Sequence, residues 1–444
     1  MNGMLTVFRN AWVDTQLRKK ILYTLFIIIL FRLGSSIFVP FLNNEGIGQL
    51  IGDASLLNYL DTMTGGALSK GTLLAMSITP YINASIIIQL LTVAIPPLER
   101  LSKEGEEGRK KINKITKFTS LGIALIQAIA FYFTLRGGVQ DEFGVTTDLL
   151  KYGEGTDTFA QVLSAITIVA CFVAGASVII WLGDRINEKG IGNGISMILF
   201  AGIVARFPDD VNTYIKLCQT DASKIPFIIV ILVIYVVMIW FVIFMTNAER
   251  RIPVQYAKRV VGRKMYGGQS THIPIKVAMS GVMPIIFAMS LMSLPQTICF
   301  FFGIRGTGDT FWDGFVRFFS QNSPLYAVIY FLLIIAFNYF YVAISYNPVE
   351  IANNLKKNNG AIPGYRPGKP TSDFIHNSLN KITLIGAIFL GIVAIFPIIF
   401  SMVSGISGLA LGGTTMLIIV GVALETVRSL ESQIMMRHHP GFLD

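Results

Sequence analysis

Charged residues are scarce in this sequence. Asp, Glu, Lys and Arg make up 14% of the 444 residues, whereas hydrophobic residues make up 53%. Soluble domains carry about 25% charged residues, so the composition excludes an ordinary soluble domain. A bilayer core of about 30 Å takes roughly 20 apolar residues of helix. Ten such spans are predicted, at 21–39, 74–95, 118–136, 160–181, 191–206, 225–245, 273–292, 324–345, 380–400 and 408–427.

Other kinds of apolar segment are missing. We find no alternating segments of about ten residues, which are typical of β-barrel spans, so we expect an all-α membrane protein. Arg18, Lys19 and Lys20 precede an apolar run, as in a signal peptide, but no small-residue cleavage site follows. We therefore interpret this run as the first span.

Residue patterns that carry catalysis are also lacking. The three cysteines, Cys171, Cys218 and Cys299, have no paired spacing that would indicate a metal site or a disulfide framework. The sequence contains no HExxH, G-x-S-x-G or Walker A motif. Almost no ionisable residue lies near a span centre, where a proton- or sodium-coupled carrier usually needs one. We expect no enzyme activity, no cofactor and no metal ion.

Lysine and arginine are unevenly distributed between the loops. Over alternate loops, 27 fall on the side that carries both termini and 8 on the other, and Arg32 lies within the first span. Because Lys and Arg favour cytoplasmic loops, we predict that both termini are cytoplasmic. Arg32 has two interpretations: its side chain snorkels to the membrane interface, or it makes an internal polar contact.

The ten spans divide into two halves, 1–212 and 213–444, of opposite orientation. The second span of each half carries a proline, Pro80 and Pro284, with isoleucine two residues later and alanine four residues later. Inverted repeats with matching helix breaks are typical of membrane transport proteins, although proline kinks can also coincide by chance. We therefore predict two inverted-repeat halves, spans 1–5 and 6–10, around a central pore.

Glycine clusters mark the last span of each half. The stretch "GIGNGIS" occupies 190–196, and "GGTTMLII" occupies 412–419. Small residues let helix backbones approach closely. GIGNG lacks the spacing of a dinucleotide-binding fingerprint. We expect close helix contacts at both places.

Several long stretches resemble the SecY family, the channel subunits of bacterial protein-export translocases. They are "ITPYINASIIIQLL" (78–91), "LGDRINEKGIGNGISMILFAGIV" (182–204), "TNAERRIPVQYAKR" (246–259), "QSTHIPIKVAMSGVMPIIFA" (269–288) and "YNPVEIANNLKKNNGAIPGYRPGKPT" (346–371). The matches run through both halves. The resemblance implies a protein-conducting channel in the cell membrane that translocates unfolded polypeptides and releases hydrophobic segments laterally.

The resemblance also implies a plug in front of the second span, at about 57–69. It would contain Leu57, Gly65, Gly66, Ala67 and Leu68. Glycine and small side chains would keep its packing loose, because a fully buried large apolar side chain contributes about 1.5–3 kcal/mol. An ordinary extracellular loop that runs into a helix is the alternative.

A ring of aliphatic side chains is implied at the middle of the pore. Its members would be Ile82, Ile86, Ile195, Leu199, Ile286 and Ile418. Such a constriction dewets and blocks ions, yet it offers no hydrogen bonds to a passing chain. Core or lipid-facing positions are the alternative for each residue.

A lateral gate for signal sequences is implied between spans 2–3 and spans 7–8. Gln89, Thr92 and Ser290 would be polar residues along this seam. Hydrogen bonds between membrane helices contribute roughly 0.6–2 kcal/mol, which is weak enough to open. General helix packing explains each residue equally well.

Two basic loops, 246–276 and 346–381, are predicted on the cytoplasmic side. Arg366 lies between proline and glycine turn residues in "GYRPGKP", which would present it at a rigid tip. The charges either fix topology or dock partners. The resemblance implies docking of the SecA motor ATPase and the ribosome through Arg259, Arg263, Lys264 and Arg366, with SecE and SecG as small subunits.

A secondary transporter of a small solute is the rival interpretation. It would need a binding site with ionisable groups near the membrane midplane, which the spans hardly offer. An intramembrane enzyme would need a nucleophile or a metal motif, and neither is present in the sequence.

Overall fold

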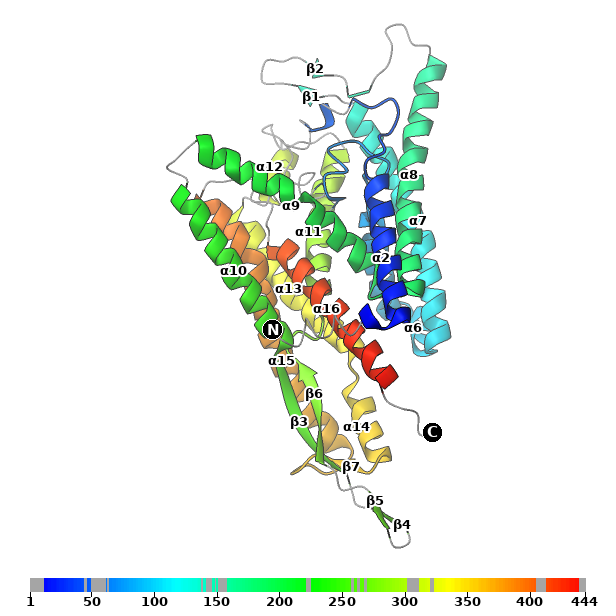
Figure 1. Ribbon diagram of the computed structural model, residues 1–444, viewed down its shortest axis with the longest axis vertical. Helices are drawn as coiled ribbons and strands as arrows, with labels where there is room; N and C mark the ends of the chain where they lie inside the picture. The colour runs from blue at the N-terminus through cyan, green and yellow to red at the C-terminus, as the bar shows by residue number, and fades with distance from the viewer. Residues whose placement is uncertain are drawn as a thin grey trace. The chain divides into compact units, whose positions relative to one another are not determined.

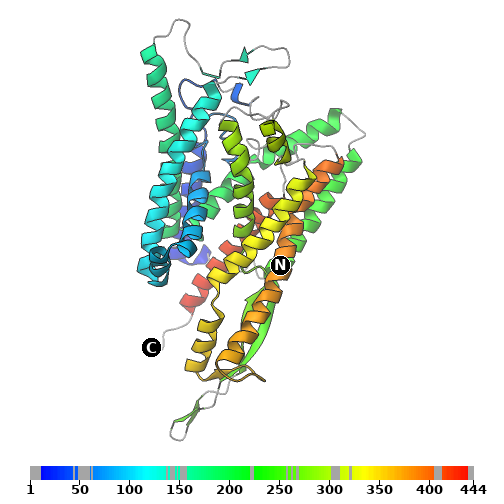
Figure 2. The same ribbon diagram turned by 180° about the vertical axis from the view of Figure 1, so that it is seen from behind.

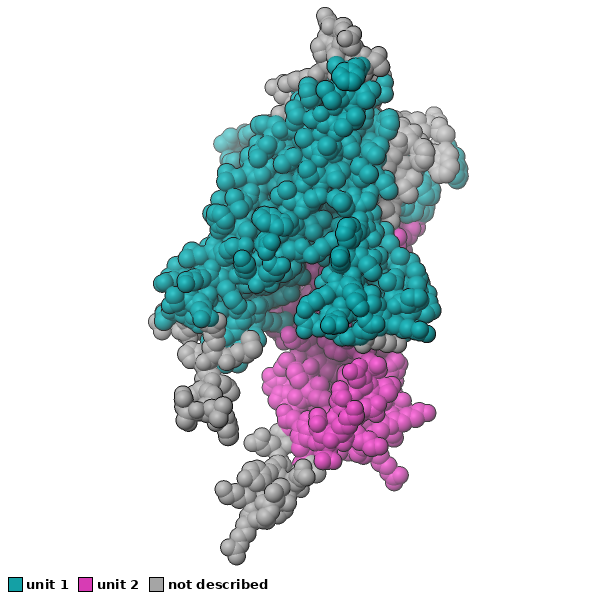
Figure 3. Space-filling view, turned by 90° about the vertical axis from the view of Figure 1, so that its right-hand side faces the viewer, with its two compact units in different colours: residues 1–220, 293–320, 422–444 teal, residues 221–292, 321–421 magenta. Residues whose placement is uncertain are grey.

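The computed structural model forms two compact units, coloured separately in Figure 3. One comprises Met1–Thr220, Ser293–Ser320 and Val422–Asp444, and the other comprises Asp221–Met292 and Gln321–Gly421. The structure describes residues 12–43, 46–48, 61, 64–136, 139–140, 146–147, 149–150, 158–220, 225–256, 259–261, 264–266, 270–301, 311–319, 323–404 and 413–438.

Helices dominate the first unit. The side chain of Asp14 caps the first of them by accepting hydrogen bonds from the N–H groups of Gln16 and Leu17. α7 and α8 lie side by side (Figures 1 and 2), where Phe131 and Phe172 meet edge to face at 5.5 Å. The elements are α2 (Thr15–Gly34), α5 (Thr79–Ala94), α6 (Pro96–Lys103), α7 (Glu106–Arg136), β1 (Val139–Gln140), β2 (Thr146–Thr147), α8 (Thr158–Lys189), α9 (Gly194–Thr220) and α12 (Phe311–Phe318).

The second unit combines helices with a small antiparallel sheet of order β6–β3–β7. Ile252, Val254 and Ile275 of this sheet pack with Leu355 and Ile375 in one buried cluster. The elements that begin in this unit are α10 (Ile225–Asn247), β3 (Glu249–Tyr256), β4 (Arg259–Val261), β5 (Lys264–Tyr266), β6 (Ser270–Lys276), α11 (Met283–Phe301), α13 (Pro324–Ser345), α14 (Pro348–Lys357), β7 (Gly360–Ala361), α15 (Lys369–Ser404) and α16 (Gly413–His438).

Several helices suit a membrane. Among the described residues, α7, α8, α13 and α15 are long and apolar enough to cross a bilayer, and α5 with α6 forms a fifth candidate bent by 105°. Outward-facing side chains of α7 are strongly apolar, since Phe118 is 68% exposed, Ile126 66% and Phe133 58%. Apolar surface of this extent is typical of contact with lipid rather than water.

Each predicted span contains a helix, but two predicted starts are wrong. The second span was expected from residue 74, yet α5 begins at Thr79 after a series of turns. The seventh was expected from residue 273, yet β6 occupies Ser270–Lys276 and α11 begins at Met283. Apolar residues at these starts are buried without being helical: Leu74 and Ile78 are 2% and 1% exposed.

The same backbone pattern precedes both of these helices. α5 begins one residue before Pro80, and α11 begins one residue before Pro284. Three residues before each proline the backbone turns into the left-handed region, with a φ of 48° at Ser77 and 60° at Gly281. A left-handed residue reverses the chain direction sharply, so both helices start from the same kind of turn.

The pattern extends to seven residues before each proline. There, the N–H of Leu73 donates to the carbonyl of Ile37 at 2.8 Å, and the N–H of Val277 donates to the carbonyl of Ala248 at 2.9 Å. Both acceptors lie just after the first helix of their unit, α2 or α10. We call this arrangement, at residues 72–80 and 276–284, the span joint.

A glycine in another helix accommodates each span joint. A Cβ atom built at Gly175 of α8 would lie 1.8 Å from the carbonyl oxygen of Leu73. One built at Gly386 of α15 would lie 2.5 Å from the carbonyl oxygen of Val277. No side chain fits at either distance, so glycine is required at both places.

The expected close contacts at "GIGNGIS" are confirmed. The hydroxyl of Thr24 on α2 accepts a hydrogen bond from the N–H of Ile191 at 3.1 Å. A Cβ at Gly190 would lie 2.6 Å from this hydroxyl oxygen, and one at Gly194 would lie 2.0 Å from the carbonyl oxygen of Gly183. The glycines therefore let the turn between α8 and α9 pack directly against α2 and α8.

Candidate functional site

The residues in front of α5 form a compact turn. We call residues 61 and 64–72 the plug segment; Leu57 lies outside the described residues. Thr64 and Ala67 are 1% exposed, Leu68 4% and Thr72 0%. The described part of this segment is therefore largely buried, and its loose packing stays a prediction. The small residues here let the backbone approach its neighbours closely, so the turn is packed through backbone contacts rather than through large side chains.

Two consecutive glycines shape the plug segment. Gly65 and Gly66 have φ angles of 69° and 81°, which side chains rarely allow. A Cβ at Gly65 would lie 2.5 Å from the carbonyl oxygen of Gly202 on α9, whereas one at Gly66 would meet nothing closer than 4.0 Å. The turn thus touches α9 through Gly65, one helical turn or less beyond Leu199.

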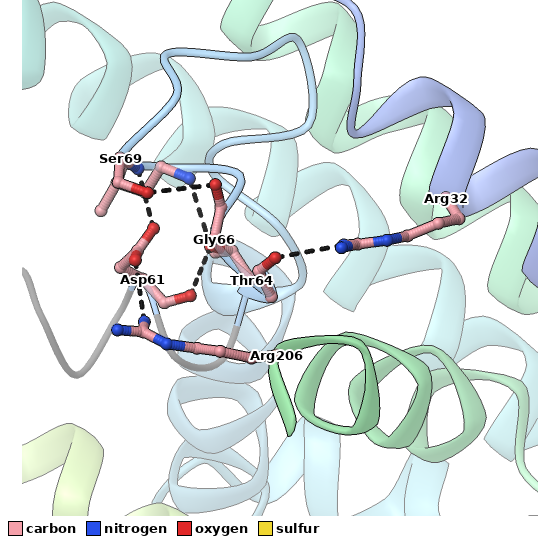
Figure 4. A network of polar contacts seen from close by, with 8 residues as sticks. Arg32, Asp61, Thr64, Gly66, Ser69 and Arg206 are labelled. Atoms are coloured by element: carbon pink, nitrogen blue, oxygen red, sulfur yellow. Dashed lines mark hydrogen bonds and ion pairs between the residues drawn. The ribbon is translucent and has the colours of Figure 1, made fainter. Parts of the chain in front are cut away.

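Asp61 is the centre of the polar contacts in the plug segment (Figure 4). One carboxylate oxygen accepts from Nη1 of Arg206 at 2.8 Å, and the other accepts from the N–H of Ser69 at 2.7 Å. Its backbone carbonyl accepts from the N–H of Gly66 at 3.0 Å and from the hydroxyl of Thr64 at 2.9 Å. A single buried residue therefore joins both ends of the turn to α9.

Arg32 approaches the plug segment from α2 (Figure 4). Its Nη1 donates to the carbonyl oxygen of Gly65 at 3.1 Å. Of the two interpretations of Arg32, the internal polar contact is confirmed. Two arginines from two different helices therefore bond to the same turn.

The candidate ring residues lie on four helices. Ile82 and Ile86 are one turn apart on α5, and Ile195 and Leu199 are one turn apart on α9. Ile86 and Leu199 are buried, and the other member of each pair is half-buried. In the second unit, Ile286 on α11 is half-buried and Ile418 on α16 is 3% exposed. Their convergence on one pore stays a prediction, because the residues belong to both units.

The candidate gate residues bond within their own helix where a partner is described. The side-chain amide of Gln89 donates to the hydroxyl of Ser85 at 3.3 Å, and the hydroxyl of Thr92 donates to the carbonyl of Ile88 at 2.7 Å. Ser290 is half-buried on α11 in the other unit. These bonds leave the role of the three residues in a lateral gate as a prediction.

Comparisons with known proteins identify the family. A family model described as SecY matches residues 72–427. The protein translocase subunit SecY of Streptomyces galbus is 42% identical over 447 residues, and that of Mycobacterium tuberculosis is 40% identical over 454. Both alignments cover 99% of this chain and 100% of the relative. The chain belongs to the SecY family.

Solved structures agree on the fold. A protein-conducting channel has a TM-score of 0.62 at 18% identity, covering 97% of this chain and 96% of its own. A SecY protein whose plug domain stabilises the closed state and maintains a membrane seal has the same TM-score, identity and coverage. Sec61 from the canine ribosome–channel complex has a TM-score of 0.61. The chain therefore has the SecY/Sec61 channel fold and is a multi-pass membrane protein.

The candidate docking residues lie on two extensions of the second unit. Arg366 is exposed, as predicted, between Gly364 and Gly368, whose φ angles are 88° and 111°. The tip is fixed because the hydroxyl of Thr371 donates to the carbonyl of Arg366 at 2.8 Å. Arg259 lies on β4 and Lys264 on β5, which pair as a short hairpin, and Arg263 lies outside the described residues.

Asp61 and Arg206 were not predicted as site residues from the sequence. Asp61 lies inside the predicted plug, and Arg206 is the last residue of the predicted fifth span, but 145 positions separate them. Their pairing follows from the fold and not from any local spacing. An acidic residue in a glycine-rich apolar stretch was the one available signal, because a buried carboxylate needs a partner.

Proposed function

We propose that this SecY-family chain forms a protein-conducting channel in the cytoplasmic membrane. It passes unfolded polypeptides across the bilayer and releases hydrophobic segments sideways into it. The observation that carries this proposal is the plug segment, a buried turn that touches α9 at Gly202, beside the ring candidates Ile195 and Leu199. A closure built on small residues and hydrogen bonds can leave and return without unfolding a large apolar core.

Ten spans in two inverted halves best explain the span joint. The same features occur the same number of residues before Pro80 and before Pro284: the left-handed turn, the hydrogen bond to the chain after the preceding helix, and the contact with a glycine. The lysine and arginine bias supports opposite orientations of the halves and cytoplasmic termini. The same joint in both halves would place Ile82 and Ile286 at equivalent positions on their helices.

The aliphatic ring is proposed to keep the resting pore dry. Replacing Ile82 or Ile286 with Asn introduces an amide that binds water, so the constriction wets and conducts ions. We expect greater chloride leakage from liposomes that contain either variant. Ile87, 41% exposed on the same helix, provides the control, because Ile87→Asn changes no ring position. Equal leakage from all three variants would refute the ring assignment.

The proposed partners are SecE and SecG in the membrane and the SecA motor or the ribosome at the cytoplasmic surface. The exposed guanidinium of Arg366 on a fixed tip suits pairing with carboxylate or phosphate groups. We expect Arg366→Glu to slow motor-driven export into vesicles, while Lys357→Glu, an exposed reversal on α14, has little effect. Export at the normal rate by Arg366→Glu would remove this residue from the docking surface.

Saturable uptake of a small solute by the purified protein alone would overturn the whole proposal in favour of a carrier. Copurification with one small membrane subunit or more would support the channel. The energy for transport would come from the motor or from translation, because we assign no catalytic step to this chain.

A further inference from the structure

We propose that the ion pair between Asp61 and Arg206 is the latch that holds the plug segment closed, and that Arg206 is the residue that sets how readily it opens. This inference rests on the proposed channel function. It assigns to one pair of side chains the task of keeping the turn against α9. The pair joins the plug segment to α9 through two oppositely charged side chains.

The burial of the pair is unequal. The side chain of Asp61 is 4% exposed, whereas that of Arg206 is 21% exposed. An isolated carboxylate is very costly to bury, so Asp61 depends on the guanidinium for its charge. Arg206 depends less on Asp61, because its partly exposed guanidinium can turn toward water.

Both carboxylate oxygens of Asp61 are engaged by different parts of the protein. Oδ2 accepts from Arg206 on α9, and Oδ1 accepts from the N–H of Ser69 within the plug segment. The backbone carbonyl of Asp61 holds Gly66 and Thr64. Asp61 thus connects the described residues of the turn to one another, and its bond to Arg206 connects them to α9.

The second attachment is of a different kind. Arg32 donates to the carbonyl oxygen of Gly65, a neutral acceptor, at 3.1 Å. Losing a hydrogen bond between a charged donor and a neutral acceptor costs less free energy than removing one partner of a buried ion pair. We therefore assign the latch to Arg206 and a guiding role to Arg32.

Unequal burial leads to an unusual expectation. Arg206→Gln leaves the carboxylate buried without its cation, so the closed state is strongly destabilised. Asp61→Asn keeps an oxygen for the N–H of Ser69 and leaves only a partly exposed arginine, so the effect is small. The double variant Asp61→Asn/Arg206→Gln carries no buried charge, and it should therefore be closer to normal than Arg206→Gln alone.

The experiment uses the full chain with its copurifying subunits in phosphatidylethanolamine–phosphatidylglycerol liposomes. Chloride efflux measures leakage, and hydrogen exchange of a peptide covering residues 64–76 measures plug opening. Arg185→Gln serves as the matched control, because Arg185 pairs with Glu188 at 2.7 Å on the exposed surface of α8. Exposed pairs contribute little, so this control should behave like the unmodified protein.

We expect Arg206→Gln to raise both rates by about tenfold or more, Asp61→Asn by about threefold or less, and the double variant to fall near Asp61→Asn. Additive damage in the double variant would overturn the latch, because it would indicate lost packing rather than an unpaired charge. Unchanged exchange in Arg206→Gln would overturn it as well. If exchange follows our order while no variant, nor the unmodified chain, translocates a precursor protein, the latch stands and the channel proposal fails.

Discussion

Gly65 and Gly66 allow a sharp test of how the plug segment is held. Both have positive φ angles, and alanine at either position must adopt a left-handed backbone. Only Gly65 also lies against another helix, since its added Cβ would be 2.5 Å from the carbonyl oxygen of Gly202. The two substitutions therefore share the backbone cost and differ in the contact with α9.

The expected magnitudes follow from these two terms. A left-handed alanine costs about 1–2 kcal/mol, which is the whole expected effect of Gly66→Ala. The close contact at Gly65 adds about 1–3 kcal/mol, because a backbone oxygen in a packed helix moves little. Gly65→Ala should therefore destabilise the closed turn by about 2–5 kcal/mol.

Hydrogen exchange of the peptide covering residues 64–76 measures this difference directly. One additional kcal/mol corresponds to roughly a fivefold change in the open population, and we expect Gly65→Ala to exceed Gly66→Ala by at least that factor. Chloride leakage should follow the same order. A peptide from α7 provides the internal control and should exchange alike in both variants.

Two outcomes would refute this reasoning. Equal exchange in Gly65→Ala and Gly66→Ala would mean that the turn does not lie against Gly202 in the resting protein. Faster exchange in Gly66→Ala than in Gly65→Ala would mean that strain in the turn, and not contact with α9, decides its position.

The remaining predictions concern stability. Asn338→Ala removes a buried amide that accepts from the hydroxyl of Ser280, so thermal unfolding should show a loss of about 2–4 kcal/mol, against about 0.5 kcal/mol or less for the adjacent Tyr339→Phe. Equal losses would contradict the buried role. Thr24→Val leaves the N–H of Ile191 without its acceptor and should cost about 1–3 kcal/mol in the same assay; no loss would mean that this N–H is not buried against α2.

The helical content was predictable because membrane-spanning helices can be recognised from their apolar composition. Each predicted span contains a helix, and the span 324–345 matches α13 at both ends. The prolines marked the two breaks, because proline favours the first turn of a helix. Pro80 and Pro284 are each the second residue of their helix.

The starts of the second and seventh spans were not predictable from apolar composition. The apolar residues within 74–78 and 273–275 are packed between helices or in a sheet, and hydropathy does not distinguish these settings from a spanning helix. Ile275, for example, is 7% exposed on β6. Where buried non-helical backbone packs against a glycine of another helix, that glycine is the one sign of the contact in the sequence.

The polar contacts of the plug segment were beyond sequence reasoning for a different reason. Arg32 had two interpretations because a long basic side chain can reach either the interface or an internal acceptor. Its acceptor is the backbone carbonyl of Gly65, which no residue type reveals. The pairing of Asp61 with Arg206 could be recognised only once the fold of the first unit was known.

The span joint determines where a helix starts, but it does not determine the structure of the segment before it. In the first unit it follows a glycine-rich turn, and in the second it follows β6, a strand of a long hairpin. The same local structure is thus preceded by two different segments, a buried glycine-rich turn and a β-strand. The lengths and sequences of these preceding segments can differ, because the joint is held by a carbonyl after the previous helix and by a glycine of another helix.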